Sequence, residues 1–215
     1  MRSTFHFLAL FSILCTVAVS SISASPHMEG VELFGGGIWT GNSRSDAGAP
    51  SPIYPSLTIG LPLRLGNGPF SFVPALTLYK AWYLYDESEE AAIPAELEQR
   101  DITAVEIIID SSFRFDMIKR KSFVTGPELS LSFDLPVPIV VWENEDESSS
   151  LVSDLYDSGK FFLPGVGWHW TVILHDTHPL LFNLKSYLPL HRFWDGEDLP
   201  FYDRLKIALR VGYRF

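Results

Sequence analysis

The sequence predicts an all-β fold, an eight-stranded antiparallel up-and-down barrel. Eight segments alternate apolar and polar residues, which is the pattern of strands that have one apolar face. The connections between these segments alternate long and short, which places every long loop at the same end. The last segment shows the pattern best, because its six large apolar residues share one parity and its four basic residues share the other.

Each expected strand shows this alternation with its own residue types. The first crosses a glycine cluster, and the second contains Pro62, which removes one ladder donor and predicts a local irregularity. The third ends in aromatic residues, the fourth and fifth set apolar residues against acids and serines, and the sixth and seventh set them against small or polar residues. In chain order the expected strands are Val31 to Trp39, Tyr54 to Leu65, Phe70 to Tyr85, Ile102 to Phe115, Ser122 to Leu135, Phe161 to Leu174, Leu180 to Leu190 and Arg204 to Phe215.

The connections differ in charge as well as in length. Gly66-Asn67-Gly68-Pro69 predicts a tight turn in which Asn-Gly supplies the positive φ angles that hairpins need. The loop from Asp86 to Arg100 is acidic, and its part from Ala91 to Gln99 could form a short helix. The turn from Asp116 to Lys121 is basic, and the loop from Pro136 to Lys160 is again acidic.

The composition is that of one exported domain with a removable leader. Met1 to about Ala24 contains a basic residue, an apolar run and then small residues, which predicts a signal peptide (residues 1–24) and a mature barrel over residues 25–215. The only cysteine, Cys15, lies in this leader, so the mature chain is expected to form neither a disulfide nor a thiolate metal site. A formal net charge of −10 argues against a nucleic-acid partner.

A membrane barrel and a soluble barrel turn the apolar face of these strands in opposite directions. After the leader, no apolar run is long enough for a spanning helix, so the mature chain could cross a membrane only as strands. In a secreted lipocalin-like carrier the leucines would instead point inward. Aromatic residues near the ends of several strands favour the membrane, where they form interfacial girdles. The expected interfacial aromatics are Trp39, Trp82, Tyr83, Trp168, Trp194 and Tyr202.

The chain end carries the clearest family resemblance. Leu209, Val211, Tyr213 and Phe215 alternate and close on an aromatic residue. In this the sequence resembles the small bacterial outer-membrane barrels of the OmpA, OmpX and OmpW type, whose last strand is a signal for the assembly machinery. The resemblance implies a transmembrane β-barrel in the outer membrane, exported through a signal peptide. It also implies that outer-membrane lipid, periplasmic chaperones and the barrel assembly machinery are partners.

In such a barrel the polar parity faces the lumen. Eight strands enclose a space that side chains nearly fill, and opposite charges there are expected to pair because an unpaired charge would be costly. The consequence is a plugged interior, and the alternative is a narrow, gated path lined by the same charges. The expected lumen charges are Arg64, Glu106, Asp110, Arg114, Glu128, Asp134, Lys185, Arg204, Lys206, Arg210 and Arg214.

No residue set predicts catalysis, a metal site or a cofactor. His169 and Thr171 faintly resemble the His-x-Ser pair of outer-membrane lipid A deacylases, but a lone histidine in a strand is more often structural. We therefore expect a non-enzymatic surface barrel whose acidic, exposed loops have a structural or adhesin-like role with an unknown external ligand. The alternatives are a narrow OmpW-like channel for small, possibly hydrophobic, solutes, then a lipid A-modifying enzyme or a secreted carrier.

Overall fold

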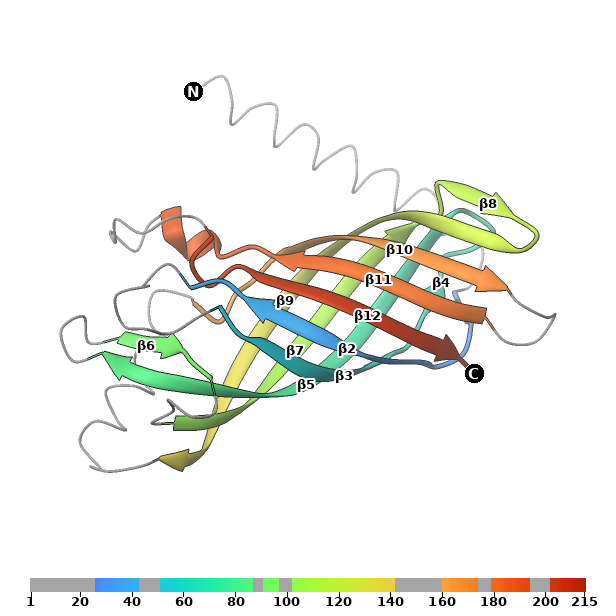
Figure 1. Cartoon of the computed structure of the whole chain (residues 1–215). Coiled ribbons are helices and arrows are strands. Elements are labelled where there is room, and N and C mark those ends of the chain that lie inside the picture. The colour runs from blue at the N-terminus through green and yellow to red at the C-terminus, as the bar shows by residue number, and fades with distance from the viewer. Residues whose placement is uncertain are drawn as a thin grey trace, which may run out of the picture.

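The computed structural model describes residues 26–42, 51–86, 91–96, 102–141, 160–173, 179–193 and 202–215. Within these ranges the chain forms a closed antiparallel β-barrel, as predicted (Figure 1). The first four strands of its wall are β2 (Glu32–Thr40), β3 (Ile53–Gly60), β5 (Phe70–Asp86) and β7 (Ile102–Phe115). The other four are β9 (Phe123–Val141), β10 (Gly165–Ile173), β11 (Pro179–Tyr187) and β12 (Lys206–Arg214).

The eight wall strands follow one another around the barrel in chain order, and β12 pairs with β2 to close it. Leu209 lies opposite Gly37 in this closing pair, and Val31 and Phe215 exchange two backbone hydrogen bonds beside it. Closure satisfies the backbone groups that an open sheet edge would expose to lipid. The up-and-down order predicted from the sequence is therefore confirmed.

Short elements extend the wall at both ends. At the end that holds the tight turns, called the turn end, β1 (His27–Met28) pairs with β4 (Leu63–Arg64), and β8 (Ile118–Arg120) folds back on β9. At the opposite end, called the loop end, β6 (Ala91–Pro94) pairs with β5, and the 3-10 helix η4 (Leu190–Phe193) follows β11. The connections at the two ends alternate in length as the sequence predicts (Figure 1).

Three local expectations are wrong. Residues 91–94 form strand β6 rather than the start of a helix, because their backbone pairs with residues 83–86 of β5. Strand β9 continues to Val141 instead of ending at Leu135, although it then contains Pro136 and Pro138. Its pairing with β10 ends at Ser130, so the prolines lie where one side of β9 has no wall strand to bond, and only β7 continues beside them.

The third wrong expectation concerns the first tight turn. Gly66 adopts the positive φ, 69°, whereas the sequence placed that role on Asn67-Gly68. The expected irregularity at Pro62 is present, because residues 61–62 separate β3 from β4. The leader, residues 1–24, lies outside the described residues.

The wall sorts its side chains by parity. On β12, Leu209 is 61% exposed and Val211 45%, whereas Arg210 is only 4% exposed. The other wall strands repeat this arrangement, with exposed Leu57, Ile109 and Leu131 on the outside. A water-soluble barrel would place its apolar residues inside, so this wall is built to contact acyl chains. Among the described residues no helix has the length and hydropathy to span a bilayer.

Glycines allow the closing strands to approach each other. A Cβ atom on Gly36 would lie 2.1 Å from the backbone oxygen of Leu209, whereas a Cβ atom on Gly35 would meet nothing within 4 Å. The two glycines are neighbours on β2, but they face opposite sides of the wall. The seam between β2 and β12 thus depends on Gly36 and not on Gly35.

Replacing Gly36 with alanine is therefore expected to weaken barrel closure. Gly36→Ala should lower the free energy of unfolding by about 1–3 kcal/mol through forced displacement of the β12 backbone. Gly35→Ala is the matched control and should leave stability unchanged or slightly raised. Urea titration in lipid vesicles, followed by heat-modifiable gel migration, measures both. Equal destabilisation by the two variants would contradict the role of the seam.

Candidate functional site

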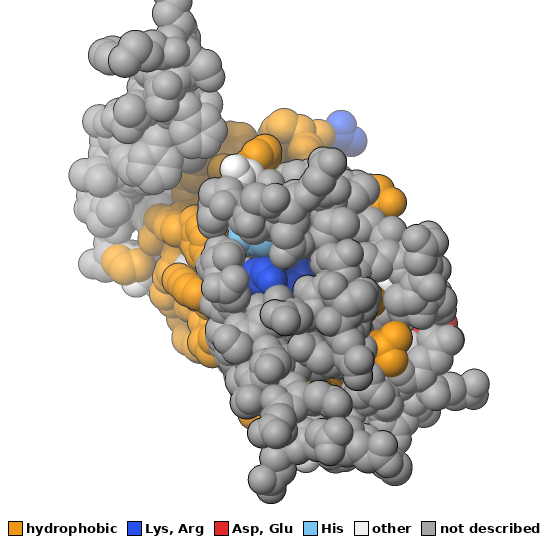
Figure 2. Space-filling view, turned by 90° about the vertical axis from the view of Figure 1, so that its left-hand side faces the viewer, with side chains coloured by type: hydrophobic (Ala, Val, Ile, Leu, Met, Phe, Trp, Pro, Cys, Tyr) orange, Lys and Arg blue, Asp and Glu red, His pale blue; other side chains and the backbone are white. Residues whose placement is uncertain are grey.

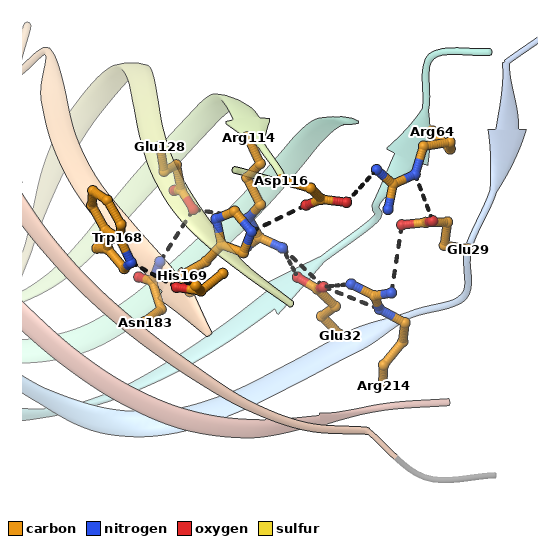
Figure 3. A network of polar contacts seen from close by, with 11 residues as sticks. Glu29, Glu32, Arg64, Arg114, Asp116, Glu128, Trp168, His169, Asn183 and Arg214 are labelled. Atoms are coloured by element: carbon orange, nitrogen blue, oxygen red, sulfur yellow. Dashed lines mark hydrogen bonds and ion pairs between the residues drawn. The ribbon is translucent and has the colours of Figure 1, made fainter. Parts of the chain in front are cut away.

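The lumen contains a network of ion pairs that joins strands on opposite sides of the barrel. Arg114 of β7 is at its centre: its Nη1 atom donates to the Glu32 carboxylate, with distances of 2.9 and 2.7 Å to the two oxygens. Its Nε atom donates to Glu128 at 2.8 Å. Arg214 also donates to Glu32, over 2.6 Å from Nη2 (Figure 3). Both carboxylates are almost completely buried.

The network continues toward the middle of the lumen through Lys185. Its Nζ atom lies 2.8 Å from Glu128 and 3.3 Å from Asp110. The hydroxyl of Tyr187 donates to Asp110 at 2.9 Å and accepts from Arg210 at 2.5 Å. Each of these side chains is at most 4% exposed, so every charge here has lost its water and is held by protein groups instead.

At the turn end the network ends in a ring of contacts around Asp116. Arg64 donates to Asp116 at 2.6 Å and to Glu29 at 2.8 Å, and His169 Nε2 lies 3.2 Å from the other oxygen of Asp116. Burial acts to raise the pKa of Asp116, but the hydrogen bonds and charges of His169 and Arg64 outweigh it and hold that pKa below its ordinary value. Asp116 is therefore a stable anion at the mouth of the barrel.

The network reaching from this mouth to Arg210 is balanced in charge. Its carboxylates number five and its lysine and arginine side chains also number five among the described residues. Balance removes the net repulsion that would otherwise accompany burial of so many charges. The members are Glu29, Glu32, Asp110, Asp116, Glu128, Arg64, Arg114, Lys185, Arg210 and Arg214, and we call them the turn-side network.

A second, smaller cluster lies nearer the loop end. Lys206 bonds Asp134 and the Tyr79 hydroxyl and lies 3.8 Å from Glu106, which accepts a hydrogen bond from Tyr83. Glu106 Oε2 and Asp134 Oδ1 have no hydrogen-bond partner among the described residues. Both residues line a cavity of about 40 Å³, which has room for an ordered water.

Figure 2 looks onto this loop end. Hydrophobic side chains flank the outside of the barrel in this view, and basic side chains are visible near its centre. The basic residues that line the small cavity are Lys160, Arg204 and Lys206.

The structure places the expected lumen charges in three settings. Seven of them, Arg64, Asp110, Arg114, Glu128, Lys185, Arg210 and Arg214, belong to the turn-side network, and Glu106, Asp134 and Lys206 form the loop-side cluster. Arg204 differs, because it precedes β12 with φ 61° and donates to the carbonyl of Ala92 at the loop end.

Sequence reasoning missed several members of the network. Glu32 shares the inward parity of Phe34, Gly36 and Ile38, so the alternation indicates that its side chain points into the lumen. It is the first residue of β2, where the alternation begins. Glu29 and Asp116 belong to turns, where alternation gives no direction. The inward direction of Tyr54 and Tyr79 is not evident from the sequence, because tyrosine suits a membrane interface as well as a filled lumen, whereas Tyr187 shares the polar parity of Lys185.

The aromatic residues expected at the membrane interface lie in different environments. Tyr83 lies inside the barrel and bonds Glu106, so it does not contact the interface. Trp82 packs edge-on against Tyr54 where β3 and β5 stop pairing, and Trp168 donates its indole hydrogen to Thr125. Trp39 is half-buried and Tyr202 is 48% exposed. Trp194 lies outside the described residues.

The C-terminal pattern residues lie together on the outer wall. Leu209, Val211 and Tyr213 are exposed along β12, and Phe215 follows at 74% exposure. His169 points the other way, into the lumen toward Asp116. The pair His169 and Thr171 is therefore turned away from the lipid surface where a lipid-modifying site would have to act. No group of metal-ligating side chains occurs in the part of the chain that the structure describes.

Comparison with solved structures identifies the architecture. The barrel is similar to the crystal structure of Neisserial surface protein A (NspA), with 13% sequence identity, a TM-score of 0.51, and coverage of 86% of this chain and 94% of that one. The chain has the fold of a small outer-membrane barrel. A weaker similarity, with a TM-score of 0.41 and 10% identity, is to the outer membrane protein Ail of Yersinia pestis, over 87% of this chain and 100% of that one. No family model and no curated protein matches the sequence.

Removing the central cation of the turn-side network is expected to destabilise the barrel strongly. Arg114→Leu leaves Glu32 and Glu128 with less compensation in a dry interior and should cost about 3–5 kcal/mol of unfolding free energy. The control is Arg120→Leu, the same substitution at an exposed position of β8. The comparison is made by urea unfolding of both variants in lipid vesicles. A loss of under about 1 kcal/mol in Arg114→Leu, the range of surface ion pairs, would refute the network's structural role.

Proposed function

We propose that this protein is an integral outer-membrane barrel that works as a closed, non-enzymatic scaffold and acts at the cell surface through its long loops. The observation that carries the proposal is the paired ionic interior, in which Arg114 bridges Glu32 on one side of the lumen and Glu128 on the other. A charge network that crosses the lumen closes the path that a solute would need. The function is then carried by the loops outside the barrel wall.

The loops are suited to such a role by position and composition. All long connections leave the loop end, opposite the end where β12 finishes. Two of them are rich in acids in the sequence, around Glu87 to Glu90 and Glu143 to Glu147, and would present a hydrated negative surface. This supports a structural or adhesin-like role toward an external ligand. The exposed pattern of β12, ending at Phe215, supports recognition by the assembly machinery during export.

The first test is ion conduction. Purified barrel inserted into planar lipid bilayers should give no unitary current steps, because the turn-side network spans the lumen. A general porin added to the same bilayer is the positive control for insertion and recording. Reproducible single-channel steps from the purified protein would replace the closed scaffold with the narrow-channel alternative.

The second test is loop display. The sole cysteine of the sequence is Cys15, so single cysteines elsewhere report their own exposure after the leader is removed. A membrane-impermeant maleimide should label Glu145→Cys, between β9 and β10, in intact cells. It should label Asp176→Cys, between β10 and β11, only in permeabilised cells. The opposite labelling pattern would reverse the orientation and end the proposal of surface loops.

A further inference from the structure

The turn end of the lumen contains a cavity that the ion pairs do not fill. Its volume is about 270 Å³, several times that of the cavity near the loop end. Its lining includes the basic side chains Arg64, Arg114, Lys119 and Arg214, whereas the acids that line it are Glu29 and Asp116. The buried carboxylates of Glu32 and Glu128 are not part of this lining. The wall of the cavity is therefore richer in positive than in negative groups.

Two guanidinium groups retain hydrogen-bond capacity there. Arg64 donates through Nε and Nη1 to Glu29 and Asp116, and Arg114 donates through the same two atoms to Glu128 and Glu32. The Nη2 groups of both arginines have no partner within the described ranges. A guanidinium already oriented by two carboxylates offers its remaining donors at little further entropic cost. Such donors match the oxygens of a phosphate group.

The rim of the cavity supplies a third cation on a surface that suits a lipid interface. Lys119 lies in β8, whose three residues are all exposed, between Ile118 at 42% exposure and the basic pair Arg120 and Lys121. Met117 beside them is 52% exposed. Apolar side chains next to lysine and arginine are typical of segments that lie at the level of lipid headgroups. Phosphate can therefore reach the cavity either from solution or on a lipid.

We propose that this turn-end cavity is a phosphate-binding site, held by Arg64, Arg114 and Lys119. The phosphate is either free or carried by the headgroup of an anionic phospholipid in the adjacent leaflet. The site goes beyond the function proposed for the loops, because it lies at the other end of the barrel, but it shares Arg64 and Arg114 with the turn-side network.

The test compares two lysines of the same short hairpin. Lys119 lines the cavity, whereas Lys121 is exposed nearby and is not part of the lining. Wild-type barrel in phosphate-free detergent is titrated with inorganic phosphate in a calorimeter. In parallel, its thermal unfolding is measured in nanodiscs of phosphatidylcholine with and without phosphatidylglycerol, since a bound ligand raises the unfolding midpoint. Lys119→Glu and Lys121→Glu pass through both measurements, with heat-modifiable migration as the check on folding.

The expected result is binding or stabilisation in at least one arm, weakened about tenfold or more by Lys119→Glu and by less than about twofold by Lys121→Glu. Saturable binding of inorganic phosphate assigns the site to the free anion. Stabilisation by phosphatidylglycerol without such binding assigns it to the lipid headgroup. No effect of either ligand on the wild type, or an equal loss in the two variants, would overturn the proposal.

Discussion

The structure depends on one constraint: charges excluded from the outer wall must find their partners inside it. The outward parity of the strands is apolar, so Arg114, Lys185 and Arg210 have only the lumen to enter. There the Coulomb attraction must offset the loss of water, which requires short contacts and additional hydrogen bonds. Such contacts form between strands that are not neighbours, as in the hydrogen bonds from Arg114 to Glu32 and from Tyr187 to Asp110. The same contacts thus fix the cross-section of the barrel and close it.

Small residues make room for this interior. A Cβ atom on Gly165 would lie 3.4 Å from Cε of Lys185, and one on Gly60 would lie 3.6 Å from a carboxylate oxygen of Glu32. Side chains from eight strands share a narrow lumen, so a long charged residue on one strand needs a short one beside it. On β12 the inward parity alternates for this reason between long basic groups and small residues, in the order Lys206, Ala208, Arg210, Gly212 and Arg214. Strand β10 therefore contributes space through Gly165 and Gly167, and its His169 contacts Asp116 where the network ends.

The alternation of apolar and polar residues predicted the architecture, because a membrane wall imposes a period of two on every strand. One face of each strand contacts lipid and must be apolar, and the other faces the lumen. The alternation could not predict where pairing between strands stops. Pro136 and Pro138 look like strand breakers until β10 is seen to leave that side of β9. Tyr83 looks interfacial until Glu106 is found within reach of its hydroxyl. Partners across the lumen, such as Arg114 and Glu32, depend on stagger around the closed barrel, which no single strand encodes.

The two ends of the lumen are unequal, and the difference separates their roles. The turn-side network balances its charges, whereas the loop-side cluster sets two carboxylates, Glu106 and Asp134, against the ammonium of Lys206. A balanced network is rigid, because displacing one side chain breaks several ion pairs at once. In the loop-side cluster, Glu106 Oε2 and Asp134 Oδ1 instead have no hydrogen-bond donor among the described residues, and both residues border a small cavity. Within the described residues, the ion pairs that cross the lumen are therefore concentrated toward the turn end, whereas the buried apolar cluster around Tyr54, Tyr79 and Ile108 lies toward the loop end.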